Sequence, residues 1–238
     1  MTMGVLLLIA AVLTLAAVYG GRRIRLAPRL LEPFQQLPFQ VGRSLETGHP
    51  LQFALGSGEL LGGEAAFTLS AVRTLERALG DALAGEVPPW VAVADPVALL
   101  YARHLFQEAA RQPATFSPLP WDRVEWAGAS PMAYAAGLTL SLGLRRVAAN
   151  VLGGSFREEA ILAGEAGHRK GAASLFAMPD PPGAAALWPL NPSIAVGEEA
   201  LTAAPREDPP GRSLAHDLLR WLLIALLIAA ALGAIGRG

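Results

Sequence analysis

The chain has 238 residues, of which 53% are hydrophobic and 16% are charged, so its charged share lies below the roughly 25% of ordinary soluble domains. It contains no cysteine, which excludes disulfide bonds, thiolate metal sites, iron–sulfur clusters and cysteine nucleophiles. The net charge of -1 at pH 7 provides no overall basic field that would attract nucleic acid, so we expect no nucleic-acid partner.

The chain begins with an apolar segment, residues 3–20, that carries no charged side chain. As a helix this segment is about 27 Å long, which is just enough to cross a bilayer. The alternative is a cleaved signal peptide, but there the positive residues precede the apolar run, and here Arg22 and Arg23 follow it. We therefore predict a transmembrane helix at 3–20 and a juxtamembrane connector at 21–44, with a short helix near 38–46.

The central segment, residues 45–204, alternates short apolar runs with longer segments of helical periodicity. The apolar runs are continuous, as is typical of strands that are buried on both faces. Strands are predicted at 51–55, 90–94, 124–127, 149–152, 173–177 and 193–196, and helices at 64–84, 96–112, 131–147, 157–170 and 182–189. This alternation predicts a mostly parallel, Rossmann-like, three-layer α/β domain.

Three junctions between a strand and a helix carry helix-start signals. Asp95 and Ser130 each precede a proline, the pattern of an N-cap residue followed by proline at the first helical position. Ser155 and Glu158 have the spacing of a capping box. All three junctions should lie at the carboxyl edge of the sheet, where α/β folds bind ligands. Asp95, Ser130 and Ser155 are therefore candidate ligand-binding residues, although each can equally serve only as a helix cap.

The first junction is rich in glycine, and it adds five candidate ligand-binding residues: Gly56, Ser57, Gly58, Gly62 and Gly63. Exposed backbone N–H groups at a helix start can bind an anion. However, Leu61 interrupts the G-x-G-x-x-G pattern, and Gly63 is followed by Glu64 where a P-loop has lysine. Glu59 and Glu64 would also repel a phosphate. A nucleotide, a small cationic or polar ligand, and a plain flexible turn are the three interpretations.

Other patterns of catalytic residues are incomplete. Glu165 and His168 supply one half of the paired Glu-x-x-His arrangement of di-iron proteins. Ser155 lacks the second glycine of G-x-S-x-G and a later histidine base. We therefore assign no catalytic residue, no metal site and no cofactor. Glu198 and Glu199 follow the last strand, and Glu198 completes the set of candidate ligand-binding residues.

The chain ends with a proline-rich linker at 205–213 and a second predicted transmembrane helix at 214–235. Arg220 can extend to the headgroups beside Trp221, a residue suited to the interface. Arginines gather at the ends of both spans that face the central domain, including Arg22, Arg23 and Arg212. The positive-inside rule then predicts two spans in the cell (inner) membrane, a cytoplasmic central domain and both termini outside the cytoplasm.

Five segments together resemble an uncharacterised family of bacterial membrane-anchored proteins, a domain of unknown function. They are GHPLQFALGSG (48–58), PPWVAVADP (88–96), ASPMAYAAG (129–137), ANVLGGSF (149–156) and AVGEE (195–199). The resemblance covers about 25–200. It implies a membrane-anchored domain and no particular activity.

Two functions follow from these features. The first is a membrane-anchored cytoplasmic domain that binds or senses a small ligand at the carboxyl edge of its sheet. The alternative is a structural or assembly module of a membrane protein complex without catalytic activity, which predicts an exposed apolar patch instead. The partners expected are the lipid bilayer and either a second copy of the chain or another membrane protein.

Overall fold

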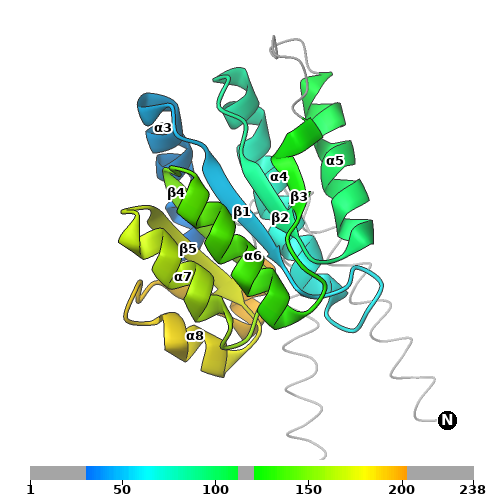
Figure 1. The fold of residues 1–238 in the computed structure, drawn as a ribbon, viewed down its shortest axis with the longest axis vertical. Helices are drawn as coiled ribbons and strands as arrows, with labels where there is room; N and C mark the ends of the chain where they lie inside the picture. Colours follow the sequence, from blue (N-terminus) through cyan, green and yellow to red (C-terminus); the bar gives the residue numbers. More distant parts are fainter. Residues whose placement is uncertain (1–30, 112–120, 203–238) are drawn as a thin grey trace, which may run out of the picture. The chain divides into compact units, whose positions relative to one another are not determined.

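The computed structural model describes residues 31–111 and 121–202, which form a Rossmann-like α/β domain (Figure 1). Six strands make one parallel sheet in the order β3-β2-β1-β4-β5-β6. The strands are β1 (Leu51–Gly56), β2 (Trp90–Val93), β3 (Val124–Trp126), β4 (Ala149–Ser155), β5 (Ala173–Met178) and β6 (Ile194–Val196). All six predicted strands are confirmed, because continuous apolar runs mark strands that are covered on both faces.

Helices cover both faces of the sheet. One face carries α2 (Glu32–Gln35), α3 (Leu37–Thr47), α4 (Ala65–Ala84), α5 (Pro96–Ala110) and the 3-10 helix η2 (Gly197–Thr202). The other face, which is the near face in Figure 1, carries α6 (Pro131–Leu144), α7 (Ala160–Arg169) and α8 (Pro181–Leu187). A short 3-10 helix, η1 (Trp121–Arg123), leads into β3. The three-layer prediction is therefore confirmed.

The segment before β1 is part of this core. Phe34 of α2 and Leu37 and Val41 of α3 are buried among the side chains of the α4 face. The predicted connector at 21–44 thus includes residues that pack against the sheet, and the short helix predicted near 38–46 is α3. Burial of three apolar side chains contributes several kcal/mol at about 1.5–3 kcal/mol each. The domain therefore includes these two helices.

The loop between β4 and α7 differs from its prediction. The predicted strand ended at residue 152, but β4 continues through the two glycines to Ser155. The capping box is wrong, because α7 begins at Ala160 and its N-cap residue, Glu159, makes no side-chain cap. The hydroxyl of Ser155 instead donates to the carboxylate of Glu64. Because glycine has no Cβ, Gly153 and Gly154 fit a strand that runs close to a neighbouring backbone. In the sequence alone, two consecutive glycines are typical of a turn.

The amino edge of the sheet holds a cluster of paired charges. The guanidinium of Arg145 binds both carboxylate oxygens of Glu125 at 2.9 Å and lies 3.6 Å from the centre of the Trp90 ring. Burial by itself would raise the pKa of Glu125, but hydrogen bonds from Arg145 and Ser141 and the charge of Arg145 outweigh it and lower that pKa. Glu125 therefore stays charged and orients the guanidinium of Arg145 at the C-terminal end of α6.

In the described residues no helix has the length and apolarity that a membrane span requires. The two predicted spans, 3–20 and 214–235, and the linker at 205–213 lie outside the described residues.

Candidate functional site

The strand order places a topological switch point between β1 and β4. The chain moves outward from β1 to β2 and β3, and then returns to add β4, β5 and β6 on the other side of β1. Loops that leave β1 and β4 thus run to opposite faces of the sheet. In open α/β sheets, ligands bind at this point, outside the carboxyl ends of the strands.

At the switch point the glycine-rich loop closes on the end of β4. The backbone N–H of Ser57 donates to the carbonyl oxygen of Ser155 at 2.8 Å, and the Ser57 hydroxyl reaches the same oxygen at 3.2 Å. Gly58 is buried against the Ser155 side chain, and its carbonyl accepts a hydrogen bond from Thr68 at 3.1 Å. Gly56, Ser57, Gly58 and Ser155 are therefore brought together at the switch point.

Positive backbone angles allow this close approach. Gly56 has φ +79°, and a Cβ there would lie 2.4 Å from the backbone nitrogen of Ser155. Gly154 has φ +99°, and a Cβ there would lie 2.3 Å from the carbonyl oxygen of Leu55. The strand register shifts between Ala54 and Gly56, as in a β-bulge. These two glycines allow the backbones of β1 and β4 to approach each other closely. The packing of the two strands accounts for both glycines without a bound ligand.

Asp95 and Ser130 are the helix caps that the sequence predicts. Asp95 accepts hydrogen bonds from the backbone N–H groups of Ala98 at 3.0 Å and Leu60 at 3.2 Å, so it also ties down the glycine-rich loop. Ser130 accepts from the N–H of Ala133 at 3.3 Å and is exposed at the start of α6. Both roles are structural, and only Asp95 touches the loop at the switch point.

The remaining candidates lie apart from this contact. Gly62 closes a turn with Glu59, its N–H donating to that carbonyl at 3.2 Å, and Gly63 has open space around it. Glu198 is exposed at the start of η2, beyond β6, and β4 and β5 separate β6 from β1 in the sheet. Glu198 therefore follows the edge strand β6, and β5 lies between that strand and β4 at the switch point.

An open depression lies beside the switch point, at the carboxyl ends of β4 and β5. Its volume is about 370 Å³, within the range of small-ligand sites. It is lined by Glu64, Ser155, Phe156, Arg157, Glu158, Pro179, Asp180 and Pro181. Of these residues, only Ser155 was among the predicted candidates. The Asp180–Pro181 pair repeats the cap seen at Asp95, with the Gly183 N–H donating to Asp180 at 2.8 Å, so the sequence carried a signal for this loop.

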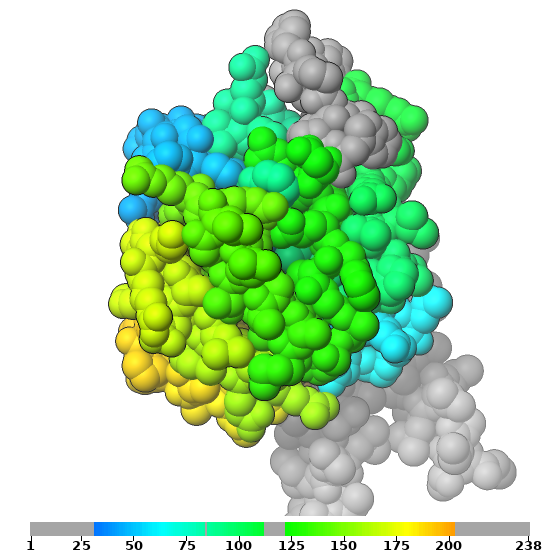
Figure 2. Space-filling model, viewed as in Figure 1, coloured from blue at the N-terminus to red at the C-terminus, as the bar shows by residue number. Residues whose placement is uncertain are grey.

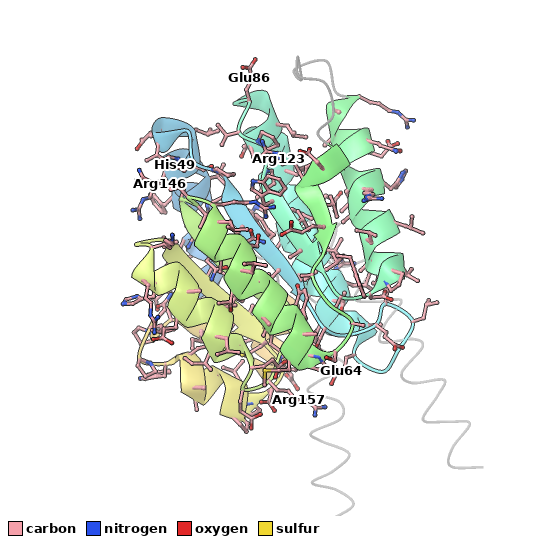
Figure 3. The ribbon with its side chains drawn as sticks, viewed as in Figure 1. His49, Glu64, Glu86, Arg123, Arg146 and Arg157 are labelled. Atoms are coloured by element: carbon pink, nitrogen blue, oxygen red, sulfur yellow. The ribbon has the colours of Figure 1, made fainter. Side chains whose placement is uncertain are left out.

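The charge of this edge is acidic. On the described loops that follow the strands, and on η2, Arg157 is the only basic side chain. The acidic side chains there are Glu59, Glu64, Asp95, Glu158, Glu159, Asp180, Glu198 and Glu199. Figure 3 shows Glu64 and Arg157 at this end of the domain, and Arg123, Arg146, His49 and Glu86 at the other. The backbone N–H groups of Ser57 and Leu60 already donate hydrogen bonds within the protein. A phosphate would therefore meet no free cluster of backbone N–H donors here, and the acidic side chains would repel it.

Tyr134, which is not among the residues predicted from the sequence, lies beneath the switch point. Its side chain is fully buried, its hydroxyl donates to the carbonyl of Ala92 at 2.8 Å, and its ring stacks on Phe156 at 5.6 Å between centroids. The backbone of Leu55 and Gly56 also hydrogen-bonds to the hydroxyl, but burial dominates and raises the pKa of Tyr134. One side chain from α6 thus connects β1, β2 and the end of β4.

In the part of the chain that the structure describes, no three His, Asp or Glu side chains form a group that could hold a metal ion. Comparisons of the chain with protein-family models, with curated proteins and with solved structures give no match. The site must therefore be interpreted from its own chemistry.

Proposed function

We propose that this chain is a membrane-anchored domain that binds a small ligand carrying a primary ammonium group in the depression at the carboxyl ends of β4 and β5. One observation carries the proposal: the carboxylate of Glu64 is held by the Ser155 hydroxyl in the wall of the depression, beside the switch point. Glu158 and Asp180 line the same space. A carboxylate fixed by a neighbouring donor can accept a further charge-assisted hydrogen bond from a cation.

The chemistry of the edge favours a cation over a nucleotide. A phosphate group would approach Glu64 and Glu158 against their charge, and only Arg157 lines the depression with the opposite sign. An ammonium group would meet several carboxylates gathered around one concave surface, so their attractions to the cation add together. Of the three interpretations of the glycine-rich loop, the small cationic ligand agrees best with this arrangement.

Binding should be measured by thermal shift of the purified full-length chain with putrescine, spermidine, lysine, AMP and inorganic phosphate. We expect at least one amine to raise the unfolding midpoint saturably, because a ligand that binds only the folded state stabilises it. Glu64→Gln should weaken that binding by about 10–100-fold, the worth of one hydrogen bond to a charged group. Glu46→Gln, which makes the same change on α3 at the opposite edge, should leave binding intact.

Two results would count against the amine site. Stabilisation by AMP or phosphate, with none by the amines, would mean that the acidic edge does not select the ligand. Equal amine binding by the Glu64→Gln and Glu46→Gln chains would mean that amines bind elsewhere.

The membrane anchor is a separate part of the proposal, and the apolar ends of the sequence support it. Because the chain has no cysteine, a Leu100→Cys variant carries a single reporter thiol on α5, where residue 100 is 68% exposed. In spheroplasts a membrane-impermeant maleimide should label this thiol only after the inner membrane is opened. Labelling of intact spheroplasts would mean that the domain lies outside the cytoplasm. Recovery of the chain in the soluble fraction would contradict the proposed membrane anchor.

The alternative function, an assembly module, is favoured by a different observation. The outward side of α6 exposes large apolar side chains, and none of them lines the depression. Ligand binding and assembly would therefore use separate surfaces of the domain.

A further inference from the structure

The depression at the carboxyl ends of β4 and β5 is lined by residues of both charges. Three acidic residues, Glu64, Glu158 and Asp180, share its wall with one basic residue, Arg157. Within the residues that the structure describes, the Arg157 guanidinium takes part in no hydrogen bond and no ion pair. A guanidinium that has no partner in the protein can bind an anionic group of a ligand through two parallel hydrogen bonds.

Two of the carboxylates also keep an oxygen atom for a ligand. Glu64 accepts from the Ser155 hydroxyl through Oε2, and Asp180 accepts from the Gly183 N–H through Oδ2 at 2.8 Å. In the described part of the chain, Oε1 of Glu64 and Oδ1 of Asp180 accept no hydrogen bond. A carboxylate has about four acceptor positions, so each can bind an ammonium group without losing its present partner. The wall thus presents acceptors for cations and a donor for an anion.

The residues of both charges belong to neighbouring loops that touch each other. Arg157 follows β4 and Asp180 follows β5, and these two strands are paired in the sheet. A Cβ at Gly183, in the first turn of α8, would lie 2.8 Å from the backbone carbonyl of Arg157, so the loops are in direct contact. Figure 2 shows their surfaces together at the lower end of the domain, and Figure 3 shows Glu64 and Arg157 at that end. One small molecule can therefore contact both charges.

We propose that the ligand of this depression is a free amino acid with a basic side chain, whose carboxylate is bound by Arg157. The inference rests on the proposed function and names the class of its ligand. Three acidic residues and one basic residue line the depression, and a basic amino acid carries the complementary set of two ammonium groups and one carboxylate. The carboxylate of Glu64, which Ser155 holds in place, binds one ammonium group, and the acidic residues of the neighbouring loops bind the other.

Other ligands with an ammonium group fit the wall less well. A diamine has no anionic group, so the charge of Arg157 would only repel it. An amino acid with a neutral side chain has one ammonium group for the three acidic residues. A phosphorylated amine carries close to two negative charges, which would meet one guanidinium and several carboxylates. The basic amino acid is the small ligand whose charges all find an opposite charge in the wall.

Calorimetric titration with L-lysine and L-lysinamide tests the contact with the carboxylate. The two ligands have the same shape and the same ammonium groups, but lysinamide has a neutral amide in place of the carboxylate. The purified full-length chain is titrated with each at about pH 6, where the α-amino groups of both ligands are protonated. We expect lysine to bind about 3–10-fold more tightly, a factor between that of an exposed ion pair and that of a buried hydrogen bond to a charged group.

Replacing Arg157 should remove this preference. Arg157→Gln should weaken lysine binding by the same factor and leave lysinamide binding unchanged, because only lysine has the carboxylate that the guanidinium binds. A change in the protein and a change in the ligand that are not additive report a direct contact between the two groups. Arg77→Gln makes the same change at an exposed arginine of α4 outside the depression, and it should keep the preference. Each variant is first checked for an unchanged thermal midpoint without ligand.

The titrations distinguish failure of this inference from failure of the proposed function. Equal binding of lysine and lysinamide, or an undiminished preference in the Arg157→Gln chain, would overturn the contact with the carboxylate and leave the amine site standing. Tighter binding of putrescine, alanine or phosphoethanolamine than of lysine would overturn the basic amino acid as the ligand class. If neither lysine nor any other amine bound, the proposed function would be wrong, and this inference with it.

Discussion

Replacing Gly56 with alanine should destabilise the domain by about 2–5 kcal/mol. Part of this cost, about 1–2 kcal/mol, is the penalty for a side chain in the left-handed region, where Gly56 has φ +79°. The rest is steric, because the new Cβ would lie 2.4 Å from the backbone nitrogen of Ser155, and relieving such an overlap typically costs about 1–3 kcal/mol. Neither backbone can move easily, since both belong to paired central strands.

The matched control is Gly63→Ala in the same loop. A Cβ at position 63 would meet no atom within 4 Å, so the change should alter stability by less than about 1 kcal/mol. Urea unfolding of the purified full-length chain, followed by tryptophan fluorescence, gives both values. If the two variants were equally stable, the contact between β1 and β4 would not be a tight backbone junction.

The comparison also separates structure from binding among the candidate glycines. Gly56 is required by the fold whether or not a ligand binds, so loss of binding in a Gly56 variant would carry no information about the site. Gly63 is free of steric constraint and exposed. Probes of the loop should therefore be placed at Gly63 or at Glu64, whose side chain lines the depression.

Secondary structure could be predicted from this sequence because each signal is local. Continuous apolar runs identified all six strands, and Asp95–Pro96 and Ser130–Pro131 placed the first residues of α5 and α6 correctly. These signals act within a few residues of the chain. Strand order cannot be predicted from such local signals, because it depends on which face of the sheet each connecting helix covers. The switch point between β1 and β4 therefore became visible only in the structure.

The site was less predictable for the same reason. Ser155 has the local pattern of a helix cap, but the pairing of β4 with β1 extends that strand and turns the hydroxyl to Glu64, 91 positions away in the sequence. Tyr134 occupies an apolar helix and looks like any core residue until the packing of α6 is known. Long-range contacts decided both roles, and no spacing in the sequence encodes them.

Tyr134→Phe should cost about 3 kcal/mol although it removes a single oxygen atom. The hydroxyl donates to the carbonyl of Ala92 at 2.8 Å and is hydrogen-bonded to the backbone of Leu55 and Gly56. In a fully buried place these backbone groups have no water to replace it, and each unsatisfied group costs about 1–3 kcal/mol. Tyr101→Phe, on the 41% exposed tyrosine of α5, should change stability by less than about 0.5 kcal/mol.

The same residue should make stability fall at alkaline pH. Burial raises the pKa of Tyr134 in the folded chain, whereas the unfolded chain keeps the ordinary value of about 10. Its contribution is complete below about pH 10 and declines above it by about 1.4 kcal/mol per pH unit, because only the unfolded state releases the proton. Urea unfolding on both sides of about pH 10 measures this slope, which Tyr134→Phe should reduce and Tyr101→Phe should leave unchanged. An equal slope in the two variants would mean that the Tyr134 hydroxyl already ionises in the folded domain. In that case a neutral phenol would not make the hydrogen bonds that join α6 to β1 and β2.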